Sequence, residues 1–209
     1  MLKAVFFDFD GTLADTGHIL YKVHDRLSIK HNLPPIPHGE MDEIRSMPIR
    51  ERFRKAGVPL FKLPQLLRET LHIYSEFIGS AAPFPGIVEL VRNLKTEGLI
   101  LSIVSSNSTK NINSFLASHQ LDLFDHIRSS PSLFGKHRTI NKALRDLSIR
   151  NDEAIYVGDE LRDITATGKV PIRIIAVSWG YDHVSLLQKG KPDYLVYTPE
   201  EIMRLIPEL

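Results

Sequence analysis

The sequence predicts an α/β fold with a parallel sheet covered by helices on both faces. From residue 86 onward, apolar runs of strand length alternate with segments of helical periodicity. This alternation is typical of right-handed crossovers between parallel strands. The first apolar run, Val-Phe-Phe at residues 5–7, has no polar residue between its apolar ones, which is typical of a strand buried on both faces.

Two carboxylates, Asp8 and Asp10, end this first strand, and Gly11 allows a sharp turn after them. Residues two apart in extended chain point to the same side. Two neighbouring carboxylates repel unless a cation lies between them or they share a proton. An Asp-Gly turn that closes a hairpin is the alternative interpretation, but it does not require Asp8, and no return strand follows.

A helical segment follows the first strand and contains no strong strand pattern. Apolar residues at helical spacing predict helices over 18–33 and 63–79, with short helices between them that are broken at Pro48 and Pro59. A turn-rich linker, SAAPFPG, ends the segment. We therefore expect two domains, an α/β core formed by residues 1–15 and 82–209 and an inserted helical domain formed by residues 16–81.

The rest of the chain supplies the remaining strands and helices of the core. Gly98 is the expected stop of the first helix after the linker. The predicted helices cover residues 86–98, 109–121, 139–149 and 199–206, and the predicted strands 99–108, 153–160, 173–180 and 193–197.

The composition limits the classes of function. The chain has 209 residues, a formal net charge of +1 and no cysteine. The near-neutral charge gives no argument for binding nucleic acid or an anionic membrane. Without cysteine there are no disulfides, thiolate metal sites or cysteine nucleophiles. The histidines show no metal-ligand spacing. No apolar run approaches a membrane span, and the N-terminus does not resemble a signal peptide, so we expect a cytoplasmic protein.

Polar residues gather where the predicted strands end, and ligands bind at the carboxyl ends of strands in such sheets. The ends of the strands, or the loops and helices after them, carry Asp8, Asp10, Ser105, Ser106, Asn107, Lys136, Asp159 and Asp163.

Four motifs in order resemble those of the haloacid dehalogenase (HAD) superfamily, in its phosphoglycolate-phosphatase-like branch with a small helical cap. They are DFDGT at residues 8–12, LSIVSSN at 101–107, FGKHRT at 134–139 and GDELRD at 158–163. The resemblance covers nearly the whole chain. It implies a Rossmann-like parallel sheet with an inserted cap and a phosphoric monoester hydrolase.

The resemblance also implies roles for individual residues. Asp8 would be a nucleophile that forms an aspartyl-phosphate, and Asp10 would protonate the leaving oxygen and later deprotonate water. Mg²⁺ would be held by Asp8, Asp159 and the backbone carbonyl of Asp10, with Asp163 acting directly or through water. The phosphoryl group would be held by catalytic Ser105 and Lys136 and by substrate-binding Gly11, Thr12, Ser106 and Asn107.

Each of these residues also has a simpler structural interpretation. Lys136 can be a solvated lysine before a helix, and Ser105 can be a helix N-cap, although Ser108 or Thr109 is better placed to cap. Glu160 and Arg162 are bulkier than residues often found within the fourth motif, and they could alter the entrance of the site.

The inserted domain is where we expect the substrate to be chosen. Arg45 and Arg50 belong to a basic stretch, RSMPIRERFRK, that can be a solvated helix face or can bind an anionic group of the substrate. An acidic leaving group would suit phosphoglycolate or another small phosphorylated acid.

Two further functions use the same scaffold. One is a sugar-phosphate mutase or phosphotransferase, and the other is a non-catalytic protein of this fold that binds a phosphorylated ligand or a partner protein. The presence of Asp10 favours phosphoryl transfer over dehalogenation, because it makes leaving-group protonation available. A mutase is less favoured, because the related phosphoglucomutases usually have an acidic motif that differs from GDELRD. We expect a small phosphorylated substrate, no nucleic acid or membrane partner, and a monomer or homodimer.

Overall fold

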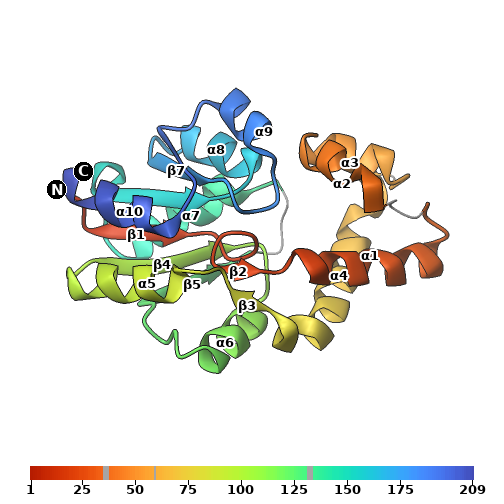
Figure 1. The fold of residues 1–209 in the computed structure, drawn as a ribbon, viewed down its shortest axis with the longest axis horizontal. Coiled ribbons are helices and arrows are strands. Elements are labelled where there is room, and N and C mark those ends of the chain that lie inside the picture. Colours follow the sequence, from red (N-terminus) through yellow and green to blue (C-terminus); the bar gives the residue numbers. More distant parts are fainter. Residues whose placement is uncertain (35–37, 59, 131–133) are drawn as a thin grey trace.

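A six-stranded parallel sheet forms the centre of the molecule, in the strand order β5-β4-β1-β6-β7-β8 (Figure 1). The structure is a computed structural model, and it describes residues 1–34, 38–58, 60–130 and 134–209. The strands of the sheet are β1 (Ala4–Phe7), β4 (Ile100–Ser105), β5 (His126–Ser129), β6 (Ala154–Gly158), β7 (Arg173–Val177) and β8 (Tyr194–Val196).

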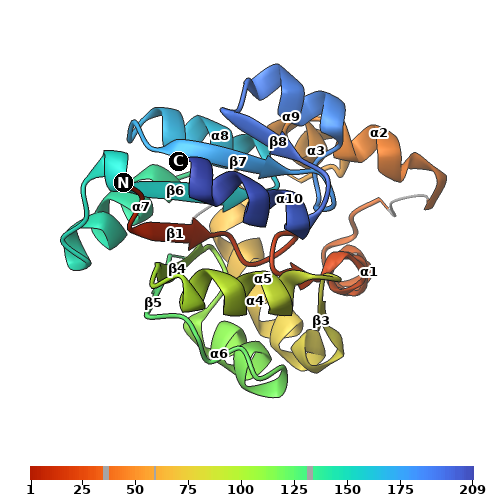
Figure 2. The ribbon, with the colours of Figure 1, turned by 60° about the vertical axis from the view of Figure 1, so that its left-hand side comes forward.

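Helices cover both faces of the sheet (Figure 2). Strand β1 is fully buried: Val5 and Phe7 belong to the core cluster that includes helices α5, α6 and α10, whereas Ala4 and Phe6 belong to the cluster that includes α7, α8 and α9. The core helices are α5 (Ile87–Thr96), α6 (Thr109–Ser118), α7 (Lys136–Asp146), α8 (Leu161–Gly168), α9 (Val184–Gly190) and α10 (Pro199–Leu205). The predicted fold class is confirmed.

Strand β5 and helix α9 of the core were not predicted from the sequence. Strand β5 lies at the sheet edge, is only half-buried, and contains a histidine, an arginine and a serine, so it has no apolar run. Helix α9 has only seven residues, which is too short for a clear period. Gly98 does follow the end of α5, with a φ of +80°.

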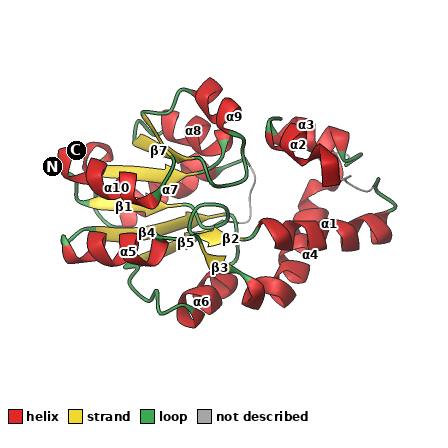
Figure 3. Cartoon of the chain, viewed as in Figure 1, coloured by secondary structure: helices red, strands yellow, loops and turns green. Residues whose placement is uncertain are grey.

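The inserted segment forms a separate group of helices beside the sheet (Figure 3). It contains α1 (Gly17–His31), α2 (Met41–Arg45), α3 (Ile49–Lys55) and α4 (Leu63–Phe77), with short 3₁₀ turns at His38–Glu40, Leu60–Lys62 and Ile78–Ser80. Pro48 precedes α3, as expected, whereas the break expected at Pro59 lies outside the described residues. We call residues 16–81 the cap, and its boundaries remain a prediction.

The two passages of the chain between core and cap lie side by side. Strand β2 (Ala14–Asp15) pairs antiparallel with β3 (Ala82–Pro83). This pairing ties both ends of the inserted segment to one point beside the carboxyl end of β1.

The register of the sheet determines which side chains meet. Phe7, the last residue of β1, is opposite Ile103 of β4 on one side and Val157 of β6 on the other. Strand order reverses at β1, which is the place where open α/β sheets bind ligands. None of the helices in the described part of the chain combines the length and apolar character needed to cross a membrane.

Candidate active site

Asp8 lies at the centre of the candidate site, directly after β1. Its side chain is buried, and its Oδ1 accepts a hydrogen bond of 2.8 Å from the Phe9 backbone N–H. Its Oδ2 lies 2.5 Å from the Nζ of Lys136. Asp8 is therefore a carboxylate with a cation directly beside it.

Lys136 is the first residue of α7, and its ammonium bridges two carboxylates. Besides Asp8, it lies 2.5 Å from Oδ1 of Asp163 on α8. Burial lowers the pKa of Lys136, but the charges of Asp163 and Asp8 outweigh burial and raise it above its usual value. Lys136 is therefore a charged lysine, held in place from both sides, rather than a solvated one.

Asp10 has neutral hydrogen-bond donors around it. Oδ1 accepts hydrogen bonds from the Tyr74 hydroxyl at 2.6 Å and the Thr16 hydroxyl at 3.1 Å, and the Asn107 amide lies 3.0 Å from Oδ2. Burial, together with the charge of Asp8, raises the pKa of Asp10 to about 6, against the lowering effect of these hydrogen bonds. Asp8 and Asp10 thus have different surroundings, as two carboxylates with different roles require.

Asp159 is held by the turn that follows Asp10. Thr12 donates its hydroxyl to Oδ1 at 2.8 Å, and the Tyr181 backbone N–H donates to Oδ2 at 2.7 Å. Gly11 has a φ of +78°, and a Cβ there would lie 2.2 Å from Asp159 Oδ2. The turn therefore needs glycine both for its conformation and for this close approach. Burial and the nearby charges of Glu160, Asp8 and Asp163 raise the pKa of Asp159 well above its usual value.

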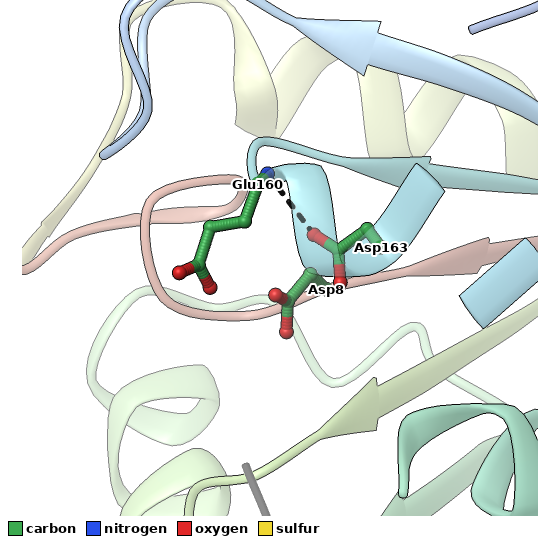
Figure 4. Close-up of side chains that lie close together, drawn as sticks. All are labelled: Asp8, Glu160 and Asp163. Carbon is green, nitrogen blue, oxygen red and sulfur yellow. Dashed lines mark hydrogen bonds between the residues drawn. The ribbon is translucent and has the colours of Figure 1, made fainter. Parts of the chain in front are cut away.

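Three carboxylates form a group that could hold a divalent cation. Asp8, Glu160 and Asp163 each offer an oxygen, and these atoms lie within 4.8 Å of one another (Figure 4). In the same view, the Glu160 backbone N–H donates to Asp163 Oδ2 at 3.2 Å. Burial raises the pKa of Asp163 to about 7, although Lys136 lowers it. Three carboxylates thus lie together here, and hard oxygen donors of this kind suit a divalent cation.

Glu160, one of these three carboxylates, also forms an ion pair with Arg162. Its carboxylate accepts hydrogen bonds from Arg162, whose Nε and Nη2 both lie 2.5 Å from Oε2. Burial raises the pKa of Glu160, but Arg162 and Lys136 outweigh burial and lower it below its usual value. Arg162 thus brings a second positive charge, besides Lys136, to this group of carboxylates.

The segment after β4 lies beside Asp10. The Ser105 Oγ accepts the Asn107 backbone N–H at 3.0 Å, which leaves the Ser105 hydroxyl able to donate. Ser106 Oγ lies 3.5 Å from Nη1 of Arg162. Ser108 caps α6 by accepting the Asn111 N–H, so Ser105 is not the cap.

Arg45 and Arg50, the two cap arginines predicted to bind substrate, lie at the boundary between cap and core. Arg45 donates to the backbone carbonyls of Gly180 at 2.8 Å and Tyr181 at 3.1 Å. The guanidinium of Arg50 lies 5.0 Å from the ring centre of Phe134, two residues before Lys136. Both are therefore near the loops that carry site residues.

Three contributors to this site were not assigned a role from the sequence. Tyr74 comes from the cap, Tyr181 contributes a backbone N–H, and Glu160 completes the carboxylate group. Glu160 lies inside the GDELRD motif, which is a signal that could have found it.

Comparison with known proteins shows the family to which the chain belongs. Residues 5–177 match the family model of the haloacid dehalogenase-like hydrolases. The chain is 28% identical to the phosphoglycolate phosphatase of Synechococcus elongatus over 209 residues, which covers 100% of this chain and 99% of that protein. It is 29% identical to the N-acetylmuramic acid 6-phosphate phosphatase of Pseudomonas aeruginosa over 194 residues, covering 87% and 84% of the two chains. The crystal structure of a predicted phosphatase from Clostridium acetobutylicum has the same fold, with a TM-score of 0.84, 23% identity and 100% coverage of both chains.

The chain has a Rossmann-like parallel sheet with buried carboxylates and a buried lysine at its carboxyl edge, and the matching family model is one of hydrolases. The chain belongs to the haloacid dehalogenase-like hydrolase family, in its phosphoglycolate-phosphatase-like branch, and it is an enzyme, a phosphatase. The predicted family and enzyme class are confirmed.

Proposed function

We propose that the protein is a Mg²⁺-dependent phosphatase that hydrolyses a small phosphorylated metabolite through an aspartyl-phosphate on Asp8. The observation that carries this proposal is the contrast between two carboxyl groups. Asp8 lies 2.5 Å from the Lys136 ammonium, whereas Asp10 has neutral donors around it and a pKa raised to about 6, mainly by burial. One group is suited to attack as a carboxylate, and the other to carry a proton.

The reaction has two steps. In the first, a carboxylate oxygen of Asp8 attacks phosphorus, the bond to the leaving oxygen breaks, and Asp10 gives its proton to that oxygen. In the second, Asp10 takes a proton from water, the water oxygen attacks phosphorus, and the bond to Asp8 breaks. Lys136 offsets negative charge on Asp8 and on the phosphoryl group in both steps. The proposed partners of the phosphoryl oxygens are Ser105, Ser106, Asn107, Gly11 and Thr12, although the Thr12 hydroxyl already donates to Asp159.

Mg²⁺ fits the oxygen donors at this edge of the sheet. Asp8 and Asp163 are proposed ligands from the sequence, and Glu160 lies with them in the group of three carboxylates. Asp159 and the backbone carbonyl of Asp10 remain proposed ligands, although Thr12 and Tyr181 already donate to the Asp159 carboxylate. Bound Mg²⁺ would supply the positive charge that reduces repulsion between a carboxylate nucleophile and a phosphate dianion.

A small phosphorylated acid such as phosphoglycolate is the proposed substrate. The full-length similarity to the phosphoglycolate phosphatase of Synechococcus elongatus supports this choice. Arg45 and Arg50 lie at the boundary between cap and core. They are the proposed partners of the substrate's carboxylate, the acidic group on its leaving alcohol.

Release of inorganic phosphate from an aryl phosphate tests this function. We expect hydrolysis in Mg²⁺, loss of activity in excess chelator, and recovery when Mg²⁺ is restored. Phosphoglycolate should then be compared with sugar phosphates of equal concentration. Full activity in chelator would remove the metal from the mechanism, and transfer of phosphate to a sugar hydroxyl instead of water would indicate a mutase. A protein that only binds phosphorylated ligands would release no phosphate from any of them.

A further inference from the structure

A residue of cap helix α4 contacts Asp10, the proposed general acid and base of the core. Tyr74 lies on α4, and its hydroxyl donates a hydrogen bond of 2.6 Å to Oδ1 of Asp10, 64 positions away in the chain. The Tyr74 side chain is 2% exposed, so water does not compete strongly for this bond. The phenol therefore has a defined partner, beyond the packing of its ring in the core cluster.

The hydrogen bonds to Asp10 are unequal between its two oxygens. Oδ1 accepts from Tyr74 at 2.6 Å, from Thr16 at 3.1 Å and, at 3.3 Å, from the Asn107 amide. In the described ranges, Oδ2 accepts only from that same amide, at 3.0 Å. A carboxyl oxygen has two lone pairs, so Tyr74 and Thr16 alone fill the capacity of Oδ1, and the Asn107 amide lies nearer to Oδ2. A proton on Asp10 therefore belongs on Oδ2.

The donors come from different parts of the molecule. Asn107 follows β4 of the core, and its own Oδ1 accepts from the Ser108 N–H and the Asn111 amide, which fixes its orientation. Thr16 lies where the chain enters the cap. Of these three donors, Tyr74 is the one that lies on a cap helix, α4. Its hydrogen bond to Asp10 therefore depends on the position of that helix.

We propose that Tyr74 is a positioning residue, which fixes the Asp10 carboxyl group so that Oδ2 is the oxygen that carries the transferable proton. This inference rests on the proposed function, in which Asp10 protonates the leaving oxygen. It means that the general acid of the core is complete only when cap helix α4 is in place. In this role Tyr74 acts through Asp10, to which it donates its hydroxyl, and not directly on the substrate.

The test compares the full-length wild-type protein with Tyr74→Phe on a series of phosphate esters in Mg²⁺. The series runs from nitrophenyl phosphate, whose leaving group needs little protonation, to an alkyl phosphate, whose leaving group needs a proton. We expect kcat for the alkyl ester to fall by about 10-fold or more, the loss for the nitrophenyl ester to stay below about 3-fold, and KM to change little. The dependence of kcat on leaving-group pKa should become steeper.

Two further variants separate positioning from packing. Tyr197→Phe, at a tyrosine that is 55% exposed, removes a phenol elsewhere and should leave all rates unchanged. In an Asp10→Asn background, Tyr74→Phe should cost nothing more on the alkyl ester, because its effect passes through Asp10. Equal losses on both esters, a change in KM alone, or a full additional loss in the Asp10→Asn background would overturn the proposal.

Different results are expected if the proposed function itself is wrong. In that case the wild-type protein would release no phosphate from any ester, or Asp10→Asn would itself leave the leaving-group dependence unchanged. Either result would remove the acid that Tyr74 is proposed to position.

Discussion

The Lys136 ammonium lies 2.5 Å from Oδ2 of Asp8, although 128 positions separate the two residues in the chain. The contact forms because β1 ends at Phe7 and α7 begins at Lys136, both at the carboxyl edge of the sheet. Lys136 is only 6% exposed, so its charge is poorly screened by water. In the proposed mechanism, this pair reduces the repulsion between the Asp8 carboxylate and a phosphate dianion.

Lys136→Gln should lower kcat by about 10²–10³-fold, because a fixed charge next to the reacting group is lost. The substitution also leaves Asp8 and Asp163 buried without the cation between them, so the melting temperature should fall. Steady-state kinetics and thermal unfolding measure the two effects. Lys142→Gln, at an exposed lysine of the same helix, is the matched control and should change neither. Wild-type kcat in Lys136→Gln would show that the lysine is purely structural.

Asp8→Asn should abolish turnover while the fold survives. An amide keeps the shape of the side chain and can still accept the Phe9 N–H, but it is not a nucleophile. Far-UV circular dichroism checks the fold, and phosphate release with Mg²⁺ checks the activity. Activity near that of the wild type, in a preparation free of contaminating phosphatase, would place the nucleophile elsewhere.

Asp10→Asn should reduce alkyl phosphate hydrolysis more than aryl phosphate hydrolysis. General acid catalysis contributes about 10²–10⁴-fold, and an alkyl leaving group depends on it most. Breakdown of the aspartyl-phosphate should also slow, because Asp10 is the proposed base. Rapid mixing with an aryl phosphate should therefore show a burst of phenol followed by slow turnover. Equal losses on both esters without a burst would assign Asp10 to metal binding or to structure.

A pH-dependent effect on stability is expected at Asp182, in the loop that meets the cap. Its carboxylate forms an ion pair with Arg52 of the cap and accepts the Leu161 N–H at 2.7 Å. Burial, followed by the charge of Glu160, raises the pKa of Asp182 from 3.8 to about 6, despite Arg52. Because the folded state binds this proton more tightly, the stabilisation is complete below pH 3.8 and is lost as the pH rises through about 6.

Urea unfolding of the wild type and Asp182→Asn across this pH range measures the effect. The free energy of unfolding of the wild type, relative to the variant, should decrease as the pH rises toward about 6 and should then level off. A difference that stays constant, or that increases with pH, would show that the ion pair with Arg52 dominates over burial.

The fold could be predicted from the sequence where burial leaves a strong pattern. β1 and β6 are apolar on both faces, so they stand out, whereas the half-buried residues of β5 carry no such signal. The carboxylates could be placed together because Asp8 and Asp159 directly follow neighbouring strands.

The contacts between cap and core could not be predicted in this way. Tyr74 lies on the apolar face of a helix, where a tyrosine is expected to be a core residue, and its hydroxyl contact depends on how α4 packs over the core. The Arg52–Asp182 pair joins positions 130 apart. Arg52 lies in the basic stretch RSMPIRERFRK, but the sequence of that stretch does not indicate its partner. Such contacts follow from the relative placement of elements, which local patterns do not encode.

The most direct test of this account is to locate the phosphoryl group on the protein. Asp10→Asn would be mixed with an aryl phosphate and Mg²⁺, quenched in acid within the burst, digested, and analysed by mass spectrometry. We predict one phosphoryl group, on Asp8 in the peptide that contains residues 4–16, and none when Asp8→Asn is added. Turnover by the wild type without any phosphoprotein in Asp10→Asn, or a phosphoryl group on another residue, would contradict the central claim that Asp8 is the nucleophile.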